Sequence, residues 1–122
     1  ALILMLDQFT RNMFRHSARA FSGDEMALAL SLRCVERKYL NAENPSYCQF
    51  MLMPMMHSED IGIQDMSLPL FEQYTSNLTY EYAMKHRDII ARFGRFPHRN
   101  AMLGRPSNRD EEQFLTQPGS SF

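Results

Sequence analysis

The stretch 77–94 constrains the fold most, because it carries a helix pattern followed by a stop signal. Gly94 fits the position just past the C-terminus of a helix, where glycine adopts a positive φ without strain. We therefore expect a helix over 78–93 with Asn77 as its cap. Large side chains recur on one face of this helix: Tyr82, His86, Ile90 and Phe93.

The first forty residues predict two more helices. Residues 1–9 form the first of them. Ser22 and Glu25 fit a capping box, in which the serine side chain and the glutamate each satisfy a free backbone amide. The second helix should run from there to about Lys38. Its apolar residues lie nearly all round, which predicts a central position.

Proline and capping signals mark the middle of the chain. Pro54 should end or kink the short apolar segment 47–53. Ser58 is the expected N-cap of a helix over 59–74. Pro69 lies inside that span, which predicts a kink or two shorter helices.

The C-terminal part adds one more short helix. Ser107 and Asp110 fit a second capping box, which should open a helix to about Thr116. No segment predicts a convincing strand. We therefore predict an all-α fold of antiparallel helix pairs, arranged as a tetratricopeptide-like short superhelix or as a bundle, in a single domain over 1–122.

Charge is distributed unevenly along a chain whose net charge is −1. Residues 39–84 carry six acidic and no basic side chains, whereas 85–109 carry seven basic and one acidic. The two regions could neutralise one another within the fold, or the basic region could form an anion-binding surface. Both alternatives stay open. Arginines outnumber lysines eleven to two, and the planar guanidinium suits bidentate contacts with carboxylate or phosphate.

Several classes of protein are disfavoured by composition. No apolar run approaches the roughly 20 residues of a membrane-spanning helix. Cys34 and Cys48 lack CxxC spacing, which predicts two reduced core thiols and a cytoplasmic location. The sequence pI of about 6.5 and the lack of a stacking platform disfavour nucleic acid. No ligand spacing such as HExxH occurs, so we predict no metal and no cofactor.

Polar and apolar side chains alternate between residues 6 and 15. This alternation fits a hydrogen-bond network at a helix end, and it equally fits one wall of a polar pocket. The candidate ligand-binding residues of this segment are Asp7, Gln8, Arg11, Asn12 and Arg15.

Residues 57–60 place an imidazole, a hydroxyl and two carboxylates next to one another. Catalytic Ser/His/Asp groups usually converge from separate segments, so Ser58 is better explained as a helix cap. His57 and Glu59 remain candidates for acid–base chemistry.

The stretch 86–100 interleaves arginines and histidines with large apolar side chains. This mixture places charged groups in a partly dry environment, where electrostatic interactions are stronger than in water. His86, on an apolar helix face, is either a hydrogen-bonded core residue or a catalytic candidate, and His98 is a second catalytic candidate. Their spacing from His57 does not favour a metal site. The candidate ligand-binding residues here are Arg92, Arg95, Arg99 and Asn100.

Five motifs resemble those of a bacterial family catalogued as domain of unknown function 924: LDQFTRNMFR, MPMMHSED, HRDIIARFGRFPHRN, LGRPS and QPGSSF. The resemblance covers essentially the whole chain. It implies an all-helical, tetratricopeptide-like protein and no established activity. It also implies a further N-terminal portion ahead of Ala1, so we expect this chain to correspond to the C-terminal two-thirds of the family's domain. Apolar surface on Leu2, Leu4 and Met5 would then favour self-association or a partner chain.

Three hypotheses follow for the function. In the favoured one, polar motif residues from three segments meet in an arginine-rich cleft that binds a small anion or an acidic peptide. In the second, the protein is a hydrolase-like enzyme that uses His57 or Glu59 as a base and an arginine to stabilise negative charge. In the third, the motifs form an ion-pair network that holds the helices in register.

Overall fold

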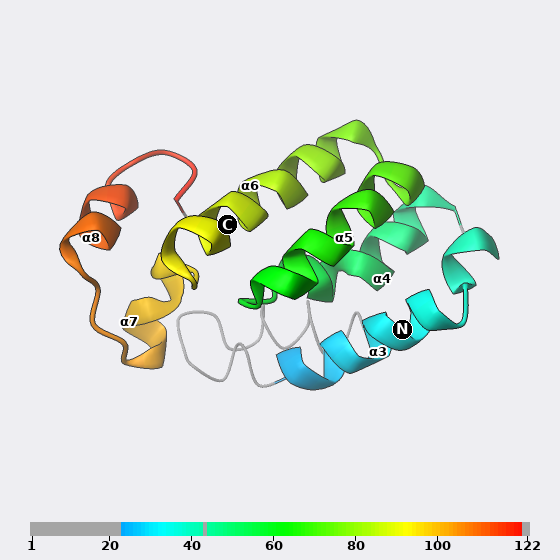
Figure 1. Cartoon of the computed structure of the whole chain (residues 1–122), viewed down its shortest axis with the longest axis horizontal. Coiled ribbons are helices and arrows are strands. Elements are labelled where there is room, and N and C mark those ends of the chain that lie inside the picture. The colour runs from blue at the N-terminus through cyan, green and yellow to red at the C-terminus, as the bar shows by residue number, and fades with distance from the viewer. Residues whose placement is uncertain (1–22, 43, 121–122) are drawn as a thin grey trace.

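The computed structural model describes residues 23–42 and 44–120. Over these residues the chain forms six α-helices and two short 3-10 helices, with no strand (Figure 1). The predicted all-α fold is confirmed, while the tetratricopeptide-like arrangement stays a prediction. The helix expected over 1–9 lies outside the described residues.

Four helices joined by short connections pack side by side in chain order (Figure 1). The 3-10 helix η3 (Tyr39–Ala42) connects the first two. The main core lies between the helices and includes Leu52, Met55 and Phe71, whose exposed fraction is 0%. The four helices are α3 (Asp24–Glu36), α4 (Pro45–Met56), α5 (Ile61–Tyr74) and α6 (Asn77–Phe93).

The first of these helices is not central, contrary to the expectation from its apolar composition. Among the described α-helices, only α4 makes extensive contact with α3. α3 therefore lies at one side of the stack (Figure 1). Met26 on its outer face is 60% exposed, and only Ala27 and Ser31 of its residues are buried. α4 and α5 occupy the middle because each contacts helices on both sides.

The chain turns sharply after α6 and adds three short helices at that end of the stack (Figure 1). These are η4 (Pro97–Arg99), α7 (Asn100–Leu103) and α8 (Arg109–Leu115). Gly94 ends α6 with φ +74°, which confirms the predicted stop. A second apolar cluster, built on Ile89, Ile90 and Phe96, holds this end together, and Phe114 of α8 packs against it.

The N-cap of α5 lies two residues later than expected. Asp60, not Ser58, begins the helix, and its Oδ1 accepts from the amides of Gly62 at 2.8 Å and Ile63 at 3.3 Å. Ser58 Oγ accepts instead from the Asp60 amide at 3.1 Å. A carboxylate also interacts favourably with the positive end of the helix dipole, which a hydroxyl does not do.

Other caps are displaced by one residue. Ser76 caps α6 in place of Asn77, and α8 begins with a capping box of Asn108 and Glu111, one residue later than expected. Gly23 occupies the N-cap of α3, one residue later than the expected Ser22. Ser22 itself lies outside the described residues.

Neither internal proline ends its helix. Pro54 lies inside α4, which continues to Met56, and Pro69 lies inside an unbroken α5. A proline removes one hydrogen bond of the helix interior. Burial of the side chains that follow, Met55 and Met56 after Pro54 and Phe71 after Pro69, offsets that loss.

The buried face of α6 differs in part from the predicted one. Tyr82 is 45% exposed, so it does not share the core with His86. Asp88, on the exposed side of this helix, lies 3.7 Å from the Arg87 guanidinium. The buried residues of this helix are Thr79, Ala83, His86, Ile89 and Ile90.

Candidate functional site

Two imidazoles and one guanidinium gather around the fully buried ring of Phe96, and a third imidazole lies near one of the two. The His86 ring meets it edge-on at a centroid distance of 5.6 Å, and the His98 ring lies at 5.7 Å. The Arg99 guanidinium stands 4.7 Å over the ring centre. The ring of His57 lies 6.2 Å from that of His86. We call His57, His86, His98 and Arg99 the imidazole–guanidinium cluster.

Helix ends and one sharp turn bring these residues together. His57 follows the last turn of α4, while His86 lies on the buried face of α6. The turn after α6 carries both Phe96 and Arg99 back toward them. Arg99 Nη2 donates to the backbone carbonyl of His57 at 2.9 Å, and Arg99 Nη1 lies 3.8 Å from Asp24 at the start of α3. Arg99 therefore ties the end of α4 and the start of α3 to the turn.

His86 is a neutral imidazole at pH 7. Burial is the largest cause that lowers its pKa, and a hydrogen bond to the Tyr82 carbonyl raises it. Together with the nearby charges of His57, His98 and Arg99, which also lower it, the net pKa is about 3. That bond joins His86 Nδ1 to the Tyr82 carbonyl at 2.7 Å, so Nδ1 carries the proton of the neutral ring.

The neutral state of His86 predicts a pH dependence of stability. An unfolded histidine takes up a proton below pH about 6.5, whereas folded His86 does so only near pH 3. Stability should therefore fall with decreasing pH through this window, by up to about 1.4 kcal/mol per unit. In urea unfolding between pH about 6.5 and 4.5, His86→Gln should show a shallower decline than the wild type. Equal slopes would contradict a neutral, buried His86.

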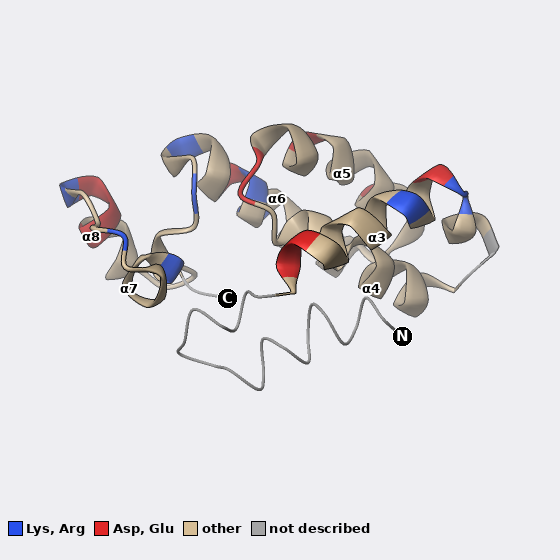
Figure 2. Cartoon of the chain, turned by 90° about the horizontal axis from the view of Figure 1, so that it is seen from below, with Lys and Arg blue, Asp and Glu red and all other residues tan. Residues whose placement is uncertain are grey.

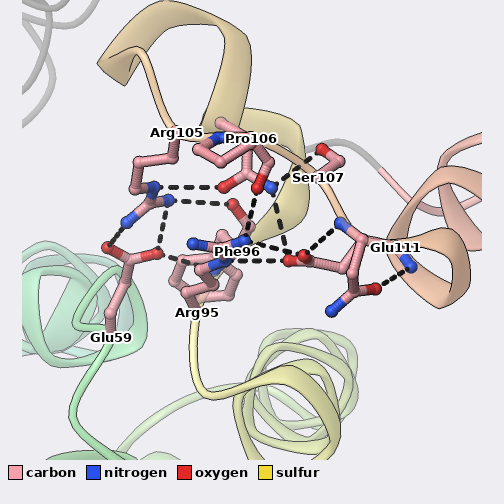
Figure 3. Close-up of polar contacts among 9 residues, drawn as sticks. Glu59, Arg95, Phe96, Arg105, Pro106, Ser107 and Glu111 are labelled. Carbon is pink, nitrogen blue, oxygen red and sulfur yellow. Dashed lines mark hydrogen bonds and ion pairs between the residues drawn. The ribbon is translucent and has the colours of Figure 1, made fainter.

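A bidentate ion pair lies beside the cluster (Figure 3). Arg105 donates from Nη1 and Nη2 to the two oxygens of Glu59 at 2.9 and 3.0 Å. Glu59 Oε2 also accepts from the amide of Phe96 at 2.6 Å. The remaining donor of this fork, Arg105 Nε, reaches Asn100 Oδ1 at 3.0 Å.

A second bidentate pair joins the turn after α6 to α8 (Figure 3). Arg95 donates from Nε and Nη2 to Glu111 at 2.9 and 2.7 Å. Glu111 also accepts from the Asn108 amide at 3.1 Å and from Asn100 Nδ2 at 3.3 Å. Because Asn100 bonds to both pairs, Glu59, Arg95, Asn100, Arg105 and Glu111 form one connected set, which we call the ion-pair network.

The two carboxylates of the network are held ionised. Hydrogen bonds from Arg95 lower the pKa of Glu111 to about 2, with help from Asn108 and Asn100 and against burial. For Glu59, burial raises the pKa, but the hydrogen bonds and charges around it outweigh burial and the pKa is lowered. Since both oxygens of Glu59 are occupied by donors, its geometry suits holding structure better than accepting a proton.

Basic and acidic side chains therefore neutralise one another at several places within the fold. Arg105 and Arg87 of the basic region pair with Glu59 and Asp65 of the acidic middle. Arg95 pairs with the C-terminal Glu111. In Figure 2, acidic residues colour the first turn of α8, and basic residues lie on the segments that precede it.

The structure brings together most of the residues predicted from the second and third motifs. His57, His86, His98 and Arg99 form the cluster, while Glu59, Arg95 and Asn100 belong to the adjoining network. Arg92 lies elsewhere, with its guanidinium 4.6 Å from the ring centre of Phe93 and 5.7 Å from that of Phe114. The candidates of the first motif lie outside the described residues: Asp7, Gln8, Arg11, Asn12 and Arg15.

Three important residues were not among the predicted site residues. Phe96 is the centre of the cluster, and Arg105 and Glu111 complete the two ion pairs. Arg105 lies within the motif LGRPS, and Glu111 lies in an acidic helix start, so both signals were present in the sequence. Neither signal shows which distant partner the side chain meets.

Metal-binding geometry and membrane-spanning length are two further properties of the described residues. No group of three or more histidine, cysteine, aspartate or glutamate side chains there is arranged to hold a metal ion. In the same part of the chain, no helix is both long and apolar enough to cross a bilayer.

The described residues form an all-α protein whose two polar clusters lie where the helix stack meets its C-terminal helices. The family described as "Bacterial protein of unknown function (DUF924)" matches residues 1–119, and the chain belongs to this family. A solved structure of a protein of unknown function from Agrobacterium tumefaciens is similar, with a TM-score of 0.87 and 37% identity over 93% of this chain. The match spans 64% of that protein's length. No curated protein matches the chain.

Proposed function

We propose that this protein binds a small anion at the imidazole–guanidinium cluster. The observation that carries the proposal is the convergence of three separate segments: His86, His98 and Arg99 lie against one buried ring, and His57 lies beside His86. His57 and His98 are half-buried, and Arg99 has an exposed fraction of 5%. Donors in such a partly dry place attract an anion more strongly than they would in water.

The ion-pair network reduces the number of arginines that we propose as contacts of the anion. Arg95 is bidentate to Glu111, so its guanidinium serves an internal carboxylate. Arg92 lies on aromatic rings away from the cluster. We assign the proposed anion contacts to Arg99, whose guanidinium also faces Asp24 at 3.8 Å, and to the imidazole N–H groups of His57 and His98. The part that Arg11 would play stays a prediction.

Thermal stabilisation tests this proposal. A ligand that binds only the folded state stabilises it in proportion to the logarithm of its concentration, by about 2.7 kcal/mol at 100 times its Kd. We expect phosphate, sulfate or a small carboxylate to raise Tm by several degrees at constant ionic strength. An acidic peptide forms a second arm of the same panel. The Arg99→Gln variant should lose the response, and Arg109→Gln, an exposed arginine at the start of α8, should keep it.

A flat response of the wild type across the panel would contradict anion binding. It would favour the alternative in which the network only holds the helices in register. An equal response in Arg99→Gln and the wild type would move the binding site away from the cluster.

The hydrolase-like alternative retains one observation in its favour, the proximity of the three histidines. Glu59 is a poor candidate for its base, because Arg105 and the Phe96 amide occupy both of its oxygens. In this alternative the base would be His57, with Arg99 stabilising negative charge.

Two further properties belong to the same proposal. The free thiols of Cys34 and Cys48 are consistent with a cytoplasmic location, where thiols stay reduced. Self-association through Leu2, Leu4 and Met5 stays a prediction, since these residues lie outside the described part of the chain.

A further inference from the structure

Phe96 is held by both polar groups of its backbone. Its amide donates to Glu59 Oε2 at 2.6 Å, and its carbonyl accepts from Arg105 Nη2 at 3.3 Å (Figure 3). Glu59 precedes α5, whereas Arg105 follows α7, so the two holding side chains come from opposite directions in the chain.

The two side chains that hold Phe96 also hold one another. Their bidentate pair, at 2.9 and 3.0 Å, fixes the relative orientation of carboxylate and guanidinium as well as their distance. Arg105 Nε is fixed in turn by Asn100 Oδ1 at 3.0 Å. Lysine could not make these contacts together, because an ammonium is a point donor without the planar fork.

The ring of the same residue organises the imidazole–guanidinium cluster. His86, His98 and Arg99 all lie against it, and a shift of the ring would displace all three at once. The Glu59–Arg105 pair itself is partly open to water, with side-chain exposures of 25% and 26%. Ion pairs exposed to water contribute little to overall stability, so the main consequence of this one is local.

We propose that Glu59 and Arg105 are positioning residues for the anion site, and that they act by clamping the backbone of Phe96 so that its ring presents His98 and Arg99 to the ligand. This inference rests on the proposed anion binding at the cluster. The effect of the clamp on the position of the Phe96 ring can be measured without a ligand. The Phe96 ring current acts on the protons of the neighbouring imidazoles, so their NMR signals report where the ring lies.

The test compares Arg105→Gln with the wild type by the imidazole proton signals of His86 and His98 and by the affinity for inorganic phosphate. We expect both signals to shift, and phosphate affinity to fall about tenfold. Arg105→Lys should restore part of each change, because it retains the charge but not the fork. The matched control is Arg87→Gln, which removes the 2.7 Å pair with Asp65 on the exposed side of α6 and should leave both readouts unchanged.

Unchanged imidazole signals in Arg105→Gln would overturn the clamp, whatever happens to phosphate. Shifted signals with unchanged phosphate affinity would overturn the positioning role. If the wild type does not bind phosphate or the other anions, the proposed function fails, while the imidazole signals still decide whether the clamp exists. If Arg105→Gln does not fold, Arg105→Lys and Glu59→Gln carry the same two readouts.

Discussion

Replacement of Phe96 by alanine should destabilise the protein by about 3–5 kcal/mol, the usual cost of removing a fully buried phenylalanine ring. The variant should also lose the anion response, because His86, His98 and Arg99 lose the surface against which they pack. Urea unfolding measures the first effect, and the dependence of Tm on phosphate measures the second. Phe96→Leu, which leaves a smaller cavity, gives a milder version of both.

The control for this prediction is Phe71, which is equally buried but lies in the main core between α4, α5 and α6. Phe71→Ala should cost a similar free energy of unfolding, and Phe71→Leu a smaller one. Both variants should keep the anion response as long as they fold. Equal loss of the response at the two positions would mean that Phe96 has no special relation to the site.

Removal of the Glu111 carboxylate should be the second large effect. Glu111→Ala should lower the free energy of unfolding by about 3 kcal/mol, because four hydrogen-bond donors lose their acceptor at a position that is 1% exposed. α8 should loosen first, and faster hydrogen exchange of its amides would show this. The exposed neighbour Glu112→Ala should change stability by less than about 0.5 kcal/mol.

The stabilisation by the Glu111 carboxylate should decrease as the pH falls. The folded pKa of Glu111 is lowered to about 2, below the roughly 4.3 of an unfolded glutamate. The stabilisation is therefore complete above pH about 4.3, and it is lost as the pH falls toward 2. The difference in stability between wild type and Glu111→Ala should shrink over that window. A constant difference would show that the ionised carboxylate is not what holds α8.

Helix content was predictable because its signals are local. Apolar spacing and the glycine stop located α6 closely, since both act within one helical turn. Caps were less predictable because several cap-forming residues stand together, as at residues 57–60, and small differences in free energy choose among them. Pro54 and Pro69 misled the prediction because burial beyond each proline is a tertiary effect that local sequence does not reveal.

The site was predictable as a set of residue types but not as a set of partners. His57, Glu59, His86, His98 and Arg99 were expected to converge, and the structure places them together. The sequence does not show which arginine meets which carboxylate, because Glu59 and Arg105 are far apart in the chain and meet only in the folded protein. Arg92 illustrates the opposite case, since its guanidinium lies against the rings of Phe93 and Phe114 rather than at the cluster.

The most direct test of the central claim, that the gathered imidazoles and guanidinium form one anion site, is an NMR titration of the histidine ring protons with inorganic phosphate. We expect saturable shifts of the His57 and His98 signals with a common Kd, and we expect these shifts to be lost in Arg99→Gln. Absence of shifts in the wild type, or the same shifts in Arg99→Gln, would contradict it.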